Sequence, residues 1–160
     1  MSHMANPTNI EQRLEALGIR LPLAPTPLGA YVEAAQSNGL LFLSGTLPVE
    51  VGKPKYLGRI GAELSVEDGR RASRLAALNG VSIAKEYLGS LDKVRRVIRL
   101  GVSLVTTPDF REHPKVADGA SELLVDIFGA EKMPVRVVLG VASLPLGVCV
   151  ELELILAIET

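Results

Sequence analysis

The segment Met133–Glu153, MPVRVVLGVASLPLGVCVELE, contains two apolar strand patterns separated by a Leu-Pro turn. The first pattern carries one charged side chain, Arg136, in an otherwise apolar run. The second alternates apolar residues with Glu151 and Glu153, which places both carboxylates on one face of that strand. The segment therefore predicts two closing strands of a sheet, each with charged side chains whose partners or roles must be explained.

Arg136 is the sharpest candidate for a ligand-binding residue. A guanidinium in apolar surroundings needs a partner, and its planar fork matches a carboxylate through two parallel hydrogen bonds. The carboxylate could belong to a ligand. It could also belong to Glu151 or Glu153, if the two strands form a hairpin. Spacing alone leaves both interpretations open.

Two further residue types could take part in chemistry. Glu151 or Glu153 could hold a water for attack on an electrophilic carbon, or could simply form a polar strand face. Tyr31, at the start of an earlier strand pattern, offers a hydroxyl and an apolar ring, or could serve packing alone.

The rest of the chain alternates helical and strand patterns. Thr8-Asn9-Ile10-Glu11 has the form of a capping box, and an Asn38-Gly39 pair marks a hairpin turn. We expect, in order, a helix over 8–18, strands over 31–36 and 40–45, a surface loop over 49–62, a helix over 65–88, a strand over 94–106, a helix over 116–128, and strands over 135–142 and 148–158.

This order predicts an α+β fold with one sheet and its helices on one face. The chain has 160 residues, enough for a single domain, which we place over 5–160 with residues 1–3 as a cloning remnant. The opposite sheet face would be apolar and uncovered in a monomer, so we predict a homo-oligomer.

Composition excludes several classes of protein. The net charge of -1 argues against a nucleic-acid binder, and the arginines at 70, 71, 74, 95, 96 and 99 are interpreted as solvated faces. The single cysteine, Cys149, lies in an apolar strand and is expected to pack as a small hydrophobe. His113 is the one histidine outside the remnant, so neither a Cys/His zinc site nor a histidine triad is expected. The chain lacks a run of about 18 uncharged apolar residues, so we expect no membrane span and a cytoplasmic protein.

Four segments resemble the Rid family, the reactive intermediate deaminases also known as the YjgF or L-PSP family. The family patterns are Gly-x-Tyr-x-x-Ala, Ser-Gly-Gln-Ile/Leu-Pro, Pro-x-Arg with a later Leu-Pro turn, and a closing Val/Ile-Glu-x-Glu strand. The matching segments are Gly29 with Tyr31–Ala34, Leu43–Pro48, Pro134–Arg136 with Leu144–Pro145, and Val150–Glu153. The likeness covers residues 27–159, and the chain resembles a longer, divergent branch of the family.

The resemblance implies a chorismate-mutase-like fold, with a single mixed sheet and two main helices on one face. It further implies a trimer whose sheets surround a central barrel, ligand clefts between subunits, and no metal or other cofactor. By position, Arg136 would grip a substrate carboxylate and Glu151 would orient the hydrolytic water. The residues implied to line the cleft are Tyr31, Ser44, Gly45, Asp118 and Val138, the last through its backbone carbonyl.

Three departures from the family pattern bear on the substrate. Thr46 replaces a glutamine, Val138 replaces a frequent cysteine, and Asp118 replaces an asparagine and adds a negative charge. The favoured hypothesis is hydrolysis of 2-imino or enamine acids to 2-keto acids and ammonia. The alternatives are a non-catalytic binder of small carboxylates and, ranked last, an endoribonuclease.

Overall fold

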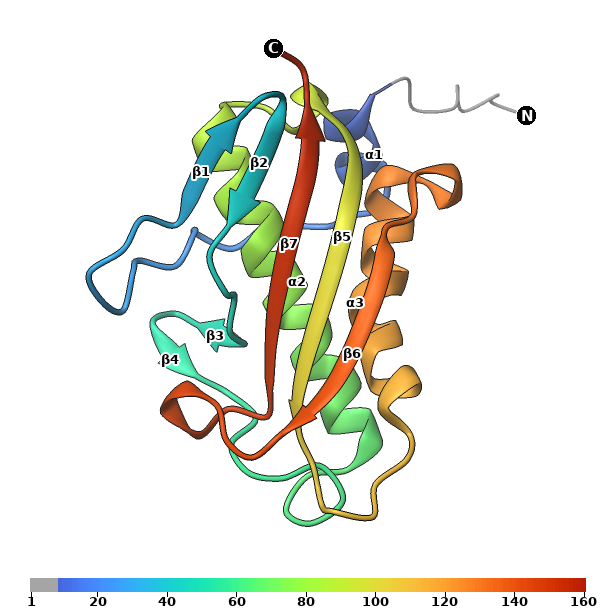
Figure 1. Cartoon of the computed structure of the whole chain (residues 1–160). Helices are drawn as coiled ribbons and strands as arrows, with labels where there is room; N and C mark the ends of the chain where they lie inside the picture. Colours follow the sequence, from blue (N-terminus) through green and yellow to red (C-terminus); the bar gives the residue numbers. More distant parts are fainter. Residues whose placement is uncertain (1–8) are drawn as a thin grey trace.

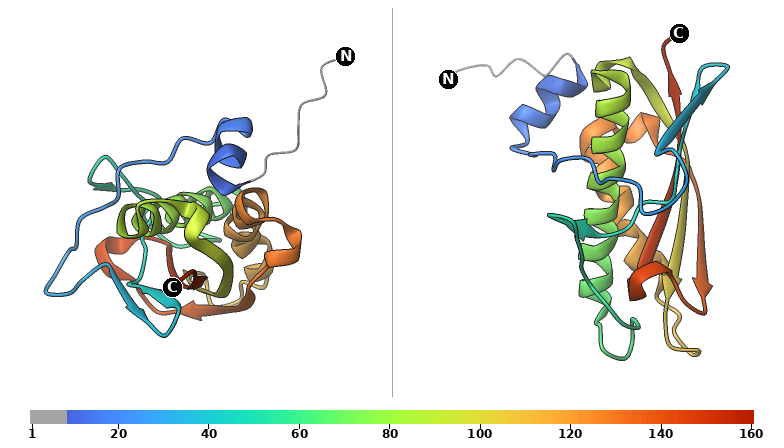
Figure 2. Two further views of the ribbon diagram at one scale, coloured as in Figure 1. Left: turned by 90° about the horizontal axis from the view of Figure 1, so that it is seen from above. Right: turned by 90° about the vertical axis from the view of Figure 1, so that its left-hand side faces the viewer.

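The computed structural model describes residues 9–160 as one mixed sheet backed on one face by two long helices (Figure 1). The sheet has the strand order β1-β2-β7-β5-β6, with β5 and β6 parallel and the other pairs antiparallel. Figure 2 shows the helices on the same side of the sheet. The strands are β1 (Ala34–Ser37), β2 (Leu40–Leu43), β5 (Val94–Val105), β6 (Val135–Val141) and β7 (Val150–Ile158), and the helices are α1 (Ile10–Ala16), α2 (Val66–Leu88) and α3 (His113–Phe128). The predicted α+β architecture is confirmed.

Local signals define the helix ends. The Ser65 hydroxyl accepts a hydrogen bond from the Asp68 backbone N–H (3.0 Å), the Asp68 carboxylate accepts one from the Ser65 N–H (2.9 Å), and α2 ends at Gly89 with a φ of 81°. α1 is capped by Asn9, which accepts from the Gln12 N–H. Thr8, the predicted first residue of that helix, and residues 1–3 lie outside the described residues.

α2 and α3 approach each other closely at Gly119. A Cβ at this position would lie 2.8 Å from the carbonyl carbon of Arg70, so the contact is made by backbone. The Arg70 guanidinium then crosses to α3, where it donates to the Lys115 carbonyl and to the Glu122 carboxylate, both at 2.7 Å. α3 begins at His113, three residues before the predicted start, because Pro114 is well tolerated in the first turn of a helix.

The core lies between the sheet and the two long helices. Alternate residues of β7 from Val150 to Ile158 are buried against them. Cys149, just before β7, is fully buried, and burial raises the pKa of its thiol to about 12. The cysteine is thus a packing residue, as predicted.

β6 and β7 do not form a hairpin, which corrects the expectation for the closing strands. β5 lies between them, and its Leu100 pairs with Arg136 of β6 on one side and Leu154 of β7 on the other. The reason is the crossover through α3, which returns the chain parallel to β5 and leaves the other edge of β5 for β7.

Within residues 9–160, no element covers the sheet face opposite the helices (Figure 2). Apolar side chains stand on that face, including Val135, Val137 and Leu139 of the edge strand β6, which are 69%, 41% and 55% exposed. Phe42 of β2 is 41% exposed as well. The predicted uncovered apolar face is present, and the oligomer that would cover it stays a prediction. None of the helices among the described residues is long and apolar enough to cross a membrane.

Candidate functional site

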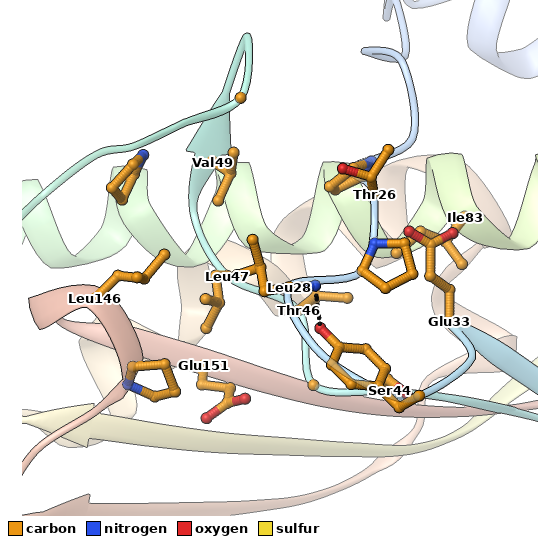
Figure 3. Close-up of a pocket in the computed structure, with 17 residues that line it drawn as sticks. Thr26, Leu28, Glu33, Ser44, Thr46, Leu47, Val49, Ile83, Leu146 and Glu151 are labelled. Atoms are coloured by element: carbon orange, nitrogen blue, oxygen red, sulfur yellow. Dashed lines mark hydrogen bonds between the residues drawn. The ribbon is translucent and has the colours of Figure 1, made fainter.

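A cavity of about 550 Å³ opens where the chain leaves β2 and crosses toward α2 (Figure 3). Four of the predicted site residues line it: Tyr31, Ser44, Gly45 and Glu151. Much of the remaining wall is apolar and includes Leu28, Leu47, Val49, Ile83 and Leu146. The fold therefore gathers side chains from segments more than a hundred residues apart into one apolar cavity with a carboxylate on its wall.

Glu151 of β7 is the half-buried acid of this cavity. Its carboxylate lies against Gly45, where a Cβ would be 2.9 Å from the Glu151 Cδ, so only glycine leaves room for it. Burial raises the pKa of Glu151, and the nearby negative charge of Glu153 raises it further. A carboxylate with a raised pKa is a stronger base once ionised, which suits activation of a water.

Tyr31 and Ser44 shape the wall of the cavity. The Tyr31 hydroxyl accepts a hydrogen bond from the Leu28 N–H at 3.0 Å, drawn in Figure 3. The Ser44 hydroxyl donates to the Val32 carbonyl at 2.6 Å. Tyr31 was predicted to lie at the start of a strand. β1 begins only at Ala34, so Tyr31 lies before the strand instead.

Asn79 of α2 positions the cavity wall and was missed as a site residue. Its buried amide donates to the carbonyls of Leu47 and Val49, both at 2.9 Å. These bonds hold the segment that leads into β3 (Val49–Glu50) and β4 (Lys53–Pro54), a short hairpin within the predicted 49–62 loop. The available signal was a lone polar amide at an apolar position of the helix pattern.

Thr46 and Glu33 are two further polar residues of the cavity. Thr46, which stands in place of the family glutamine, is buried, and its hydroxyl has no hydrogen-bond partner within residues 9–160. Glu33 lines the opposite end of the cavity from Glu151 (Figure 3), and burial followed by the charge of Glu86 raises its pKa. Sequence reasoning did not single out Glu33, which lay inside an expected strand.

Arg136 lies elsewhere, under α3. Its Nη1 donates to the Asp118 Oδ1 at 2.7 Å and to the Ser121 hydroxyl at 3.0 Å. The protein partner of Arg136 is therefore Asp118, and the interpretation that named Glu151 or Glu153 was wrong. Val138, two residues along β6, shares this side of the sheet and packs against the core.

The predicted site residues thus form two groups on opposite sides of the sheet. Arg136 and Val138 lie on the sheet face that packs against the helices, where Asp118 of α3 pairs with Arg136. Glu151 shares the uncovered face with Val137 and Leu139, and these three line a second hollow of about 320 Å³. A single chain does not bring Arg136 and Glu151 together. Their side chains point to opposite faces of the sheet, and β5 lies between their strands.

Part of the Arg136 fork stays available. Within the described residues, both hydrogen bonds of the Arg136 side chain come from Nη1, and none comes from Nε or Nη2. Arg136 lies on the edge strand β6 and its side chain is 26% exposed, while the side chain of Asp118 on α3 is 44% exposed. The described residues contain no group of three or more His, Cys, Asp or Glu side chains placed to hold a metal ion.

Comparisons with known proteins identify the family of this chain. Residues 11–157 match the family described as "YjgF/chorismate_mutase-like, putative endoribonuclease". The chain belongs to this YjgF/Rid family. The resemblance inferred from the four sequence segments is confirmed.

Three relatives show the range of names within the family. Protein TCP17 of Trypanosoma cruzi is 40% identical over 145 residues, which cover 90% of this chain and 91% of that protein. A 2-iminobutanoate/2-iminopropanoate deaminase of Dermatophagoides farinae is 29% identical over 141 residues, covering 88% and 95%. A crystal structure from Shewanella oneidensis with the same endoribonuclease description superposes with a TM-score of 0.90 at 34% identity, covering 94% and 100%.

Proposed function

We propose that this protein hydrolyses 2-imino acids to 2-keto acids and ammonia. The observation that carries the proposal is the Glu151 carboxylate, half-buried beside Gly45 on the wall of an apolar cavity, with its pKa raised by burial and by Glu153. A relative named 2-iminobutanoate/2-iminopropanoate deaminase supports the reaction class.

The chemistry needs a positioned water and a held carboxylate. Glu151 accepts a proton from water as the water oxygen bonds to the imine carbon, and this proton passes to the nitrogen. The new hydroxyl group then gives its proton to the nitrogen as the carbon–nitrogen bond breaks, so that the products are the 2-keto acid and ammonia. Nε and Nη2 of Arg136 hold the substrate carboxylate in two parallel hydrogen bonds. Ser44, Gly45 and Tyr31 shape the wall against which the substrate lies. Positioning and fixed charges supply the acceleration, without a cofactor.

The complete site requires a second copy of the chain. Glu151 and Arg136 lie on opposite faces of one sheet, and β6, which carries Arg136, is an edge strand with an uncovered apolar face. We therefore propose a homotrimer in which Arg136 of one subunit meets the Glu151 cavity of the next.

Arg136→Ala tests the assignment. It should reduce kcat/KM for 2-iminobutanoate about 100-fold or more, because the substrate loses its charged anchor, while the oligomer seen by light scattering is unchanged. Arg71→Ala, an exposed arginine of α2, is the matched control and should retain full activity. Equal rates for Arg136→Ala and the wild type would reject the assignment.

A binder without turnover is the second candidate, favoured by one observation. Arg136 already has an internal carboxylate partner in Asp118, so its fork is only partly open. Stabilisation of the protein by 2-keto acids, without ammonia release from any 2-imino acid, would support this function.

The endoribonuclease name of the family makes RNA a further substrate to test, although the net charge of -1 disfavours it. Intact RNA after incubation with freshly purified protein would exclude it.

A further inference from the structure

The group under α3 contains one charge of each sign. The Asp118 Oδ1 is 2.7 Å from the Arg136 Nη1, and the Ser121 hydroxyl holds the same nitrogen at 3.0 Å. The nearby charged side chains of α3 have other partners: Lys115 pairs with Glu112 at the start of the helix, and Glu122 pairs with Arg70 of α2. The site therefore offers a ligand no net positive charge.

A simple anion fits this site poorly. A carboxylate that binds Nε and Nη2 of Arg136 would also lie close to the negative charge of Asp118, and like charges held together are strongly unfavourable. A ligand with a cationic nitrogen next to its carboxylate removes that conflict. The hydrogen bond to Arg136 uses the Oδ1 of Asp118, and its Oδ2 makes no hydrogen bond within residues 9–160.

We propose that Arg136 and Asp118 together form a zwitterion site, in which Arg136 binds the carboxylate and Asp118 binds an adjacent cationic nitrogen. Asp118 then determines specificity by charge. Ser121 is a positioning residue, since it fixes the guanidinium through Nη1 alone and leaves the other nitrogens to the ligand.

This inference rests on the proposed deaminase function and narrows its substrate. The bound form is the iminium acid, whose protonated nitrogen lies two bonds from the carboxylate carbon. Water adds to the iminium carbon, the carbon–nitrogen bond breaks, and the products are a 2-keto acid and ammonium, so that atoms and charge balance. A protonated imine is also the more electrophilic form, so the same contact that selects it activates it.

The test compares two ligands of the same shape, L-leucine and 4-methyl-2-oxopentanoate, by calorimetric titration of the full chain. The wild type should bind the amino acid about tenfold more tightly or better, and Asp118→Asn should reverse the preference by at least as much. Asp118→Glu keeps the charge and should retain the wild-type order. Asp126→Asn, an exposed residue of the same helix with the same change in charge, should do so too.

The outcomes separate this inference from the deaminase proposal. Wild-type protein that binds the keto acid as tightly as leucine, or binds neither ligand, overturns the zwitterion site, even if 2-imino acids are turned over. An unchanged order in Asp118→Asn overturns it as well. If the order reverses as expected while no 2-imino acid is hydrolysed, the zwitterion site stands and the deaminase assignment falls.

Discussion

The Glu151 carboxylate occupies the space that any side chain at Gly45 would need. A Cβ at position 45 would lie 2.9 Å from the Glu151 Cδ and 3.2 Å from its Cγ. The glycine is thus required by a neighbour and not by its own backbone, since its φ is not positive. Replacement of either residue reports on the other.

Gly45→Ala should displace the Glu151 carboxylate without unfolding the chain, because a side chain can rotate away. We expect kcat for 2-imino acids to fall about 100-fold, the usual effect of a catalytic group misplaced by about 1 Å. In the double variant Gly45→Ala/Glu151→Gln, the Gly45→Ala change should add nothing to the loss of kcat caused by Glu151→Gln alone. Additive losses would show that the two residues act separately.

Glu151→Gln should stabilise the protein at neutral pH while it removes activity. The folded pKa of Glu151 lies above the unfolded value because of burial and Glu153, so ionisation opposes folding. This cost is absent below the unfolded pKa and appears as the pH rises through the folded pKa. The melting temperature of the variant should exceed that of the wild type by a few degrees at about pH 7.5 and match it at about pH 3, below the ordinary glutamate value. An equal shift at both pH values would contradict the electrostatic cause.

Asn79→Ala should destabilise the chain and loosen the cavity wall. Two hydrogen bonds to the Leu47 and Val49 carbonyls are lost, at about 1 kcal/mol each, so we expect about 2 kcal/mol in the free energy of unfolding. Ser82→Ala is the control, since the Ser82 hydroxyl only bonds the Leu78 carbonyl of its own helix. Equal losses in urea titrations of the two variants would contradict the anchoring role.

Two glycines of the helices should respond differently to alanine. At Gly119 the new methyl meets the backbone of Arg70, which cannot move alone, and we expect a loss of at least about 2 kcal/mol. At Gly80 the methyl comes too close only to the Leu154 Cδ1, at 2.7 Å, the end of a flexible side chain, and its contact with the Thr46 Cγ2 at 3.6 Å is an ordinary one. The gain in helix propensity of about 1 kcal/mol should then leave Gly80→Ala near the wild type in urea titrations. The reverse order would mean that the helices can separate more easily than the sheet can repack.

Local sequence signals were sufficient for the helices and the first hairpin. Ser65 and Gly89 mark the ends of α2, and Asn38-Gly39, with φ values of 49° and 75°, forms the turn between β1 and β2. These features depend on residues a few positions apart, so they can be read without knowledge of the rest of the fold.

The neighbours of Arg136 could not be read in the same way. Adjacent strands in sequence were assumed to pair, whereas the α3 crossover places β6 next to β5. The general preference for strands joined by a crossover helix to lie side by side and parallel favours this arrangement. The pairing with Asp118 then follows from helix packing over long range, for which Asp118 and Ser121, three residues apart on a mostly buried helix face, were the only signal.

The cavity was foreseen only through family resemblance. Composition and spacing gave no reason to bring Tyr31, Ser44 and Glu151 together, because β2 and β7 are far apart in the chain. The departure of the chain from β2 after Leu43, which opens the cavity, depends on the single bridge between Thr46 and Leu152 and on the Asn79 amide. Such contacts exist only once the sheet and α2 have packed.

The complete burial of Cys149 gives the protein an internal reporter of its own opening. The sulfur is shielded by the sheet and α2, and a thiol with a pKa of about 12 is almost wholly protonated, so it is chemically inert in the native state. A thiol-reactive dye can reach it only after the surrounding packing opens. The rate of labelling therefore measures how often this part of the core opens, at the one position where the sequence has a cysteine.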